Sequence, residues 1–312
     1  MEIETKGGVY KLISCNNIIY VCIGNILYIY KLVQTLDNTY EFQLTKKSTE
    51  FTLINDIYLW KQSNTNNSKD VLNSNNYSNS NMHYLVISDL FRSIGIYSYD
   101  IKENKLLEIC RDYKSTWVYS SCQLDNNLLY LTDIEGNILT LKKNNNPIKE
   151  NDEIKMERIA FYNYGERINS MFVTKIKNKD LYKISHEDIT NSANNTINDS
   201  YEVKIVFFSS LEGSVGLIIQ INEEIFNFLK KLQNLLVKNQ TNYGGFNYDK
   251  WKNYNNGIIN LESKGFIEGD IFEKFLNNDE MYKKKIIKEL NYPWNKSYHD
   301  AIHILEALTN TH

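Results

Sequence analysis

The amino-acid sequence predicts a mainly β protein that ends in a small α-helical domain. Three observations lead to this prediction. Aromatic residues make up 13% of the chain and Tyr alone occurs 23 times, a composition that favours strands. An apolar strand–turn–strand unit recurs four times before residue 222. From residue 223 onwards, apolar residues instead follow helical spacing.

The repeated unit indicates the architecture of the β part. The second strands of its copies begin near Asn25, Ser93, Gly136 and Ser214, and the interval between the middle two is 43 residues. A four-stranded propeller blade repeats every ~40–45 residues. An apolar segment, the expected inner strand, precedes each copy at 9–14, 52–59, 117–124 and 168–173. Residues 1–222 are therefore predicted to form an incomplete, about four-bladed β-propeller; a β-sandwich, the alternative, fits this period less well.

Polar stretches interrupt the repeats, and helices follow them. Residues 62–82 are rich in Asn and Ser, residues 177–199 are similar, and both are predicted to be disordered insertions. Residues 144–152 form a shorter polar loop. Helical spacing of apolar residues predicts helices over 223–238, from Asp270 onwards, over 281–290 and over 298–308. Residues 223–312 are therefore predicted to be a helical C-terminal domain.

The stretch K-G-F-I-E-G-D, residues 264–270, could be read as a phosphate-binding loop. The glycines are not followed by the Lys-Thr or Lys-Ser pair of a P-loop, so a structural role is favoured. We expect Asp270 to cap a helix, with Glu273 reaching back to the Asp270 amide. Gly265 and Gly269 suit a backbone at positive φ or a close approach of two chain segments.

Charge and cysteine content exclude several function classes. The net charge of −3 provides no basic field for DNA or RNA, so direct nucleic-acid binding is expected to be weak or to occur through partners. The four cysteines form no C-x-x-C pair, which suits a reducing compartment. The longest apolar run, 205–221, is broken by Glu212 and reads as strand–turn–strand rather than as a membrane span.

One motif points to catalysis. His299 and His303 are spaced i, i+4, as in zinc hydrolases of the H-E-x-x-H type, with Asp300 at the position of the glutamate base. A zinc hydrolase is therefore an alternative function. Neither G-x-S-x-G nor C-x-x-C occurs. The favoured prediction is a protein without enzymatic activity, metal or cofactor.

Short motifs along nearly the whole chain carry a resemblance to a known family. They are E-T-K-G-G-V-Y at Glu4, D-L-F-R-S at Asp89, I-C-R-D-Y-K-S-T-W ending at Trp117, Y-G-E-R-I-N at Tyr164, L-E-G-S-V-G-L at Leu211 and the terminal E-A-L-T-N-T-H. Together they resemble the C-terminal third of the CPSF-A propeller family, in particular the large subunit of the UV-damaged DNA-binding complex, a cullin-4 ubiquitin-ligase adaptor. Paralogous scaffold subunits occur in the splicing SF3b complex and in the polyadenylation specificity complex, and these remain the alternative.

The resemblance implies a function. Family members carry three seven-bladed propellers and a helical domain, so this chain resembles about four blades of the third propeller together with the helical domain. They are non-enzymatic scaffolds of the nucleus and cytoplasm, linked to DNA repair and protein ubiquitination. They hold propeller-type substrate receptors by gripping a helical segment. The cullin-binding propeller has no counterpart here, so cullin binding is not expected from this segment alone.

The resemblance also implies which residues bind the partner. Trp117, Tyr58 and Ile57 are expected to be apolar anchors, and Arg92 and Arg111 are expected to meet partner carboxylates. The full set consists of Glu2, Glu4, Asn55, Ile57, Tyr58, Arg92, Arg111, Trp117, Arg167, Asn169 and Leu211.

Overall fold

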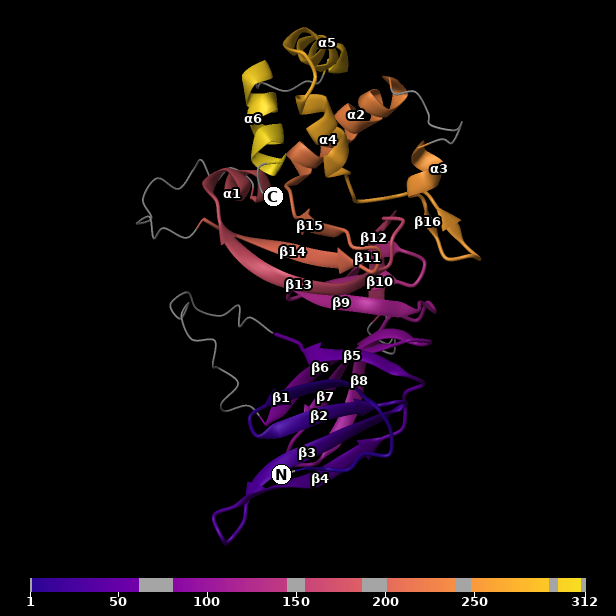
Figure 1. Ribbon diagram of the computed structural model, residues 1–312, viewed down its shortest axis with the longest axis vertical. Coiled ribbons are helices and arrows are strands. Elements are labelled where there is room, and N and C mark those ends of the chain that lie inside the picture. The colour runs from indigo at the N-terminus through magenta and orange to yellow at the C-terminus, as the bar shows by residue number, and fades with distance from the viewer. Residues whose placement is uncertain are drawn as a thin grey trace.

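Four antiparallel sheets follow one another along the chain and stack in the same order (Figure 1). The computed structural model describes residues 2–61, 81–144, 155–186, 201–239, 248–291 and 297–309. The first three sheets have four strands each, and the fourth has three. They comprise β1 (Val9–Cys15), β2 (Ile18–Ile23), β3 (Ile26–Gln34) and β4 (Tyr40–Ser48); β5 (Ile54–Leu59), β6 (Met82–Asp89), β7 (Ser93–Asp100) and β8 (Lys105–Arg111); β9 (Val118–Asp125), β10 (Leu128–Asp133), β11 (Asn137–Lys143) and β12 (Met156–Asn163); and β13 (Ile168–Lys177), β14 (Glu202–Ser210) and β15 (Val215–Ile219).

The sheets pack face to face through their apolar side chains. One core lies between the first and second sheets, around Tyr20 and Ile57. A second lies between the second and third sheets, around Ile96 and Leu131, and a third joins the third and fourth sheets. The first strand of each sheet contacts the first strand of the next, in the order β1, β5, β9, β13. This arrangement of radial four-stranded units confirms the predicted fold class.

The C-terminal part is helical, as predicted. It contains α2 (Glu223–Asn239), α3 (Tyr248–Lys252), α4 (Gly269–Leu276), α5 (Glu280–Leu290) and α6 (Tyr298–Thr309), with a small hairpin of β16 (Tyr254–Asn255) and β17 (Asn260–Leu261) between α3 and α4. The helices do not form a core of their own. Val203 and Ile205 of β14 share one core with Phe228, Phe272 and Leu305 of the helices. The helical part therefore packs on the fourth sheet (Figure 1).

The predicted insertion at 177–199 is only partly described, and its described part is not disordered. Lys177 ends β13, and α1 (Lys179–Ser185) follows. The Asn178 side chain accepts hydrogen bonds from the backbone N–H groups of Asp180 (2.9 Å) and Leu181 (3.1 Å), which begins this helix. Leu181 and Ile184 are buried in the same core as α6 and β14. Because the segment is mostly polar, its composition did not indicate these two buried residues. Residues 187–199, most of the insertion at 62–82 and most of the loop at 144–152 lie outside the described residues.

The start of α4 also differs from the sequence prediction. The residue at the cap position is Glu268, not Asp270, and no side chain caps this end. Asp270 lies in the first turn, where its charge is favourable at the positive end of the helix. The Glu268 amide donates to Gln233 Oε1 of α2 at 3.0 Å, and Lys252 Nζ lies 3.1 Å from the Glu268 carboxylate. Tertiary contacts from α2 and α3 thus fix the helix start in place of a local cap.

Gly265 meets the structural demand that the sequence suggested, and Gly269 does not. Lys264 pairs with Phe161 of β12 through two backbone hydrogen bonds of 2.9 Å. Gly265 follows at φ +78°, and a Cβ there would lie 2.5 Å from the Ala160 Cβ. A Cβ on Gly269, the first residue of α4, would meet no atom within 4 Å. Across the described ranges, no helix is both long and apolar enough to cross a membrane.

Gly265→Ala should lower the free energy of unfolding by about 1–3 kcal/mol, because the new side chain is strained at positive φ and collides with Ala160. Gly269→Ala is the matched control, and it should change stability by less than about 1 kcal/mol. Urea unfolding of both variants measures the difference. Equal stabilities would contradict this account of Gly265.

Candidate partner-binding surface

One end of the stacked sheets carries the linkers between sheets and the turns between each second and third strand. We call it the linker end; it comprises residues 48–54, 89–93, 111–118, 133–137, 163–168 and 210–215. The same backbone hydrogen bond recurs there in three sheets, joining the residue after the second strand to the residue before the first. The pairs are Leu90 N to Leu53 O (2.9 Å), Ile134 N to Trp117 O (3.2 Å) and Leu211 N to Arg167 O (2.9 Å). The motifs around Asp89, Trp117, Tyr164 and Leu211 therefore meet at one end of the molecule.

Three exposed aromatic side chains, Phe91, Tyr113 and Trp117, lie at the linker end. Phe91 is 48% exposed and Trp117 is 44% exposed. Their rings form an edge-to-face pair with centroids 5.5 Å apart. Asp89 Oδ1 accepts from the amides of Phe91 (3.0 Å) and Arg92 (3.1 Å) and so shapes the turn that carries Phe91. The Ser115 hydroxyl donates to Phe91 O at 3.3 Å. This bond joins the loop of residues 112–117, called the Trp117 loop, to that turn. Trp117 is thus accessible, and its role as an anchor stays a prediction.

Ile57 is not accessible, so its predicted role as an apolar anchor is wrong, whereas Tyr58 is half-buried and its role stays a prediction. Ile57 is 0% exposed and packs in the core between the first two sheets. The Tyr58 hydroxyl is buried, and burial raises the pKa of this phenol well above its usual range. Both residues lie in β5, the inner strand of a sheet that has a neighbour on each face. Each of the two side chains on opposite faces of β5 therefore points into a core.

The predicted polar residues near Trp117 make specific contacts. The Asn55 amide donates to the backbone oxygens of Val118 (3.2 Å) and Tyr119 (2.7 Å), which joins β5 to β9. Arg92 is half-buried and donates to the backbone oxygen of Glu50. Arg111 lies 3.5 Å from the Glu108 carboxylate, and its guanidinium stands 4.7 Å from the centre of the Tyr113 ring. Asn55 and Arg92 thus hold the sheets and turns together.

The remaining predicted residues lie at the two outer sheets. Glu2 and Glu4 are exposed before β1 of the first sheet. On the fourth sheet Arg167, Asn169 and Leu211 are exposed. The Arg167 amide donates to the Glu212 carboxylate at 3.2 Å, and the Ser209 hydroxyl lies 3.3 Å from the Asn169 side-chain oxygen. The predicted residues therefore lie on all four sheets. Trp117 lies in the linker between the second and third sheets, beside Phe91, which was not predicted.

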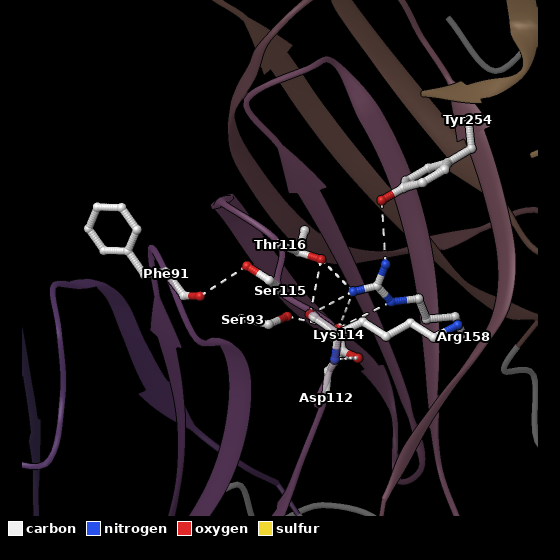
Figure 2. Close-up of polar contacts among 8 residues, drawn as sticks. All are labelled: Phe91, Ser93, Asp112, Lys114, Ser115, Thr116, Arg158 and Tyr254. Carbon is white, nitrogen blue, oxygen red and sulfur yellow. Dashed lines mark hydrogen bonds and ion pairs between the residues drawn. The ribbon is translucent and has the colours of Figure 1, made fainter. Parts of the chain in front are cut away.

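Beneath the Trp117 loop lies a buried ion pair (Figure 2). Arg158 of β12 contacts Asp112 with an N–O distance of 2.6 Å, and the two side chains are 9% and 2% exposed. Asp112 Oδ2 also accepts from the Ser93 hydroxyl at 2.8 Å. Arg158 Nη2 donates to Lys114 O at 2.9 Å and to the Thr116 hydroxyl. One guanidinium therefore contacts the beginning, the middle and the end of the loop that leads to Trp117.

The hairpin of β16 and β17, called the C-terminal hairpin below, is hydrogen-bonded to the third sheet beside this ion pair. Arg158 Nη1 donates to the hydroxyl of the buried Tyr254 at 3.4 Å. Asn137 and Asn255 exchange two hydrogen bonds: the Asn137 side chain donates to Asn255 O (2.7 Å) and accepts from the Asn255 amide (3.2 Å). Sequence reasoning missed Phe91, Asp112 and Arg158. The first two stand inside the motifs around Arg92 and Arg111, but nothing local marks Arg158, which lies more than forty residues from Asp112 in the chain.

The residues of the candidate zinc-hydrolase motif make structural contacts in α6. His299 and His303 lie exposed on α6, and His299 packs edge-on against Tyr298 with ring centroids 5.5 Å apart. Asp300, the candidate base, accepts from the Ser297 amide (2.7 Å) and hydroxyl (2.8 Å), which closes a capping arrangement at the start of α6. In the part of the chain that the structure describes, no three His, Cys, Asp or Glu residues are grouped so that they could hold a metal ion.

Comparison with known proteins places this geometry in a family. The family model described as the CPSF A subunit region matches residues 1–277, which is most of the chain. The chain belongs to the CPSF A subunit region family. It is 28% identical over 278 residues to DNA damage-binding protein 1b of Arabidopsis thaliana, covering 88% of this chain and 22% of that protein. It is 24% identical over 293 residues to DNA damage-binding protein 1 of Oryza sativa subsp. japonica, covering 94% of this chain and 24% of that protein.

The match covers only part of the relatives' length. The chain spans about a quarter of the length of these curated relatives, 22% and 24%. The resemblance first indicated by the short motifs is therefore confirmed at the level of the family. As a CPSF A region, the chain combines stacked propeller-type sheets with a helical C-terminal part.

Two substitutions separate surface anchors from core residues in this CPSF A region. Trp117→Ala should lower the free energy of unfolding by only about 1 kcal/mol, because it removes one half-exposed aromatic contact. Ile57→Ala should lower it by about 2–5 kcal/mol, because it leaves a cavity in the core. Chemical unfolding of both variants tests the assignment. A loss of several kcal/mol in Trp117→Ala would show that Trp117 is a core residue.

Proposed function

We propose that this chain is a non-enzymatic scaffold segment that binds a protein partner at its linker end. The observation that carries the proposal is the exposed pair of Phe91 and Trp117, held at a fixed place by the turn at Asp89 and by the loop over Arg158. Exposed aromatic side chains on a rigid base are the residues that dominate protein–protein binding. Arg111, the last residue of β8, and Tyr113, in the loop that follows, provide cationic and aromatic contacts near the pair.

We further propose that the partner is a substrate receptor of a cullin-4-type ubiquitin ligase that acts in DNA repair in the nucleus. Relatives named DNA damage-binding protein 1 support this choice. A propeller-type receptor would insert an apolar helical segment at the Phe91–Trp117 pair and place carboxylates near Arg111. The chain covers 22% and 24% of these relatives, and we expect cullin to be recovered only through other parts of the adaptor.

The second candidate is a scaffold subunit of a splicing or polyadenylation complex. The family description favours keeping it, because the CPSF A subunit region is named after a polyadenylation factor. Both candidates use the linker end as a protein-binding surface, and they differ in which proteins bind there.

Affinity purification of the tagged chain from its native cells, followed by mass spectrometry, should recover propeller-type ligase receptors. Replacing both Phe91 and Trp117 by Ala should reduce that recovery by about tenfold or more, since anchor residues contribute ~2 kcal/mol or more each. Leu36→Ala is the control. Leu36 is fully exposed in the turn between β3 and β4, away from the linker end, so its loss should leave recovery unchanged.

The identity of the recovered proteins decides between the two candidates. Recovery of splicing or polyadenylation subunits in place of ligase receptors would overturn the ligase assignment. Equal recovery by the wild-type chain and the double Ala variant would overturn the proposed surface itself.

A further inference from the structure

We infer that Arg158 is a positioning residue for the partner-binding surface: it fixes the loop of residues 112–117 so that Trp117 meets Phe91 in an edge-to-face pair. The inference rests on the proposed function, and it adds a residue outside every motif from which that function was argued. Arg158 lies on the last strand of the third sheet, whereas Asp112 follows the last strand of the second sheet. The contact therefore joins the second and third sheets (Figure 2).

The loop of residues 112–117 has no regular structure of its own. Residues 112–117 lie between β8 and β9 and belong to neither strand. Within the loop, Asp112 Oδ1 accepts from the Lys114 amide at 3.1 Å, and the Thr116 hydroxyl donates to Lys114 O at 3.4 Å. These local bonds are few. An irregular segment on a surface keeps one conformation only when contacts from outside it fix the backbone.

Arg158 supplies outside contacts at three points of the loop, in addition to the hydrogen bonds that Ser93, Phe91 O and the Ile134 amide make with it. Its guanidinium reaches the Asp112 carboxylate through Nε (3.2 Å) and Nη2 (2.6 Å), Lys114 O through Nη2 (2.9 Å), and the Thr116 hydroxyl. Nη2 carries two N–H groups, so Lys114 O and the Thr116 hydroxyl share Nη2 with Asp112, which Nε also contacts. Because Thr116 immediately precedes Trp117, the contact to Thr116 acts next to the anchor.

Positioning of the loop by Arg158 differs from compensation of the Asp112 charge. Arg158 compensates the buried charge of Asp112, since an unpaired buried carboxylate is strongly destabilising. Charge compensation alone, however, requires only the contact to Asp112. The bonds to Lys114 O and Thr116 add nothing to the neutralisation of Asp112, and they restrain the backbone on the path to Trp117. Replacing both members of the ion pair by neutral residues removes the charge problem and leaves the loss of restraint to be measured.

The decisive variant is therefore the double substitution Arg158→Gln with Asp112→Asn. Each chain, labelled with 5-fluorotryptophan, is observed by fluorine NMR, with Trp117→Phe assigning the Trp117 resonance among the four tryptophans. We expect the double variant to melt close to the wild-type temperature, while its Trp117 resonance shifts or broadens and the remaining resonances keep their positions. Recovery of the partners captured by the wild-type chain should fall by about tenfold, because binding must then order the loop.

The control is the same neutralisation at the other end of the sheets. Lys204 and Asp125 form an exposed ion pair, also with an N–O distance of 2.6 Å, where β9 ends. Lys204→Gln with Asp125→Asn should leave both the Trp117 resonance and partner recovery unchanged. Should the Arg158 double variant not fold, Thr116→Val, which removes one loop contact and keeps the ion pair, takes its place with the same expected shift in the Trp117 resonance.

An unchanged Trp117 resonance in the folded double variant, or in Thr116→Val, would overturn the inference and leave Arg158 as a charge partner only. Partner recovery equal to wild type would also overturn it. Failure of the proposed function looks different: the wild-type chain would then recover no specific partner, while the fluorine spectra would still report whether Arg158 fixes Trp117.

Discussion

Face-to-face packing of consecutive sheets is the constraint on which the rest of this structure depends. Each of the middle two sheets has a neighbour on both faces, so its two central strands are largely buried on both sides; in β7, for example, every residue from Ser93 to Tyr99 is buried. The side chains of these central strands are therefore used for packing, whichever face they point to. In the middle two sheets the linkers and turns at the ends of the central strands are accessible in their place.

The contrast between Ile57 and Trp117 follows from this constraint. Both residues were predicted to be anchors, and they lie at similar places in consecutive sheets. Ile57 stands inside β5 and is 0% exposed, whereas Trp117 precedes β9 by one residue and is 44% exposed. A shift of a few residues along the chain thus changes a side chain from core packing to surface presentation. The repeated hydrogen bond between linker and turn marks this boundary in three of the sheets.

The linker end is built on buried polar groups rather than on apolar packing. Asp89 accepts from the amides of its own turn, Asp112 is paired with Arg158, and Asn137 holds the C-terminal hairpin. Apolar contacts are not directional, so they cannot by themselves set the conformation of a loop. Hydrogen bonds to fixed backbone oxygens can do so. Buried polar groups therefore support the exposed aromatic pair, and their hydrogen bonds connect the second sheet, the third sheet and the C-terminal hairpin.

The sequence by itself determined the order and kind of most elements, but not of α1, α3 or the hairpin of β16 and β17. Alternating apolar residues and tight turns marked the four sheets, and helical spacing marked α2, α5 and α6 to within one residue at each end, because these patterns are local. Only the tertiary structure decided which side chains are accessible and what holds the loop beneath Trp117. Those features depend on residues far apart in the chain: Arg158 with Asp112, Gln233 with Glu268, and the neighbouring sheets that bury Ile57. No local pattern records such pairings, because they arise only when the sheets stack.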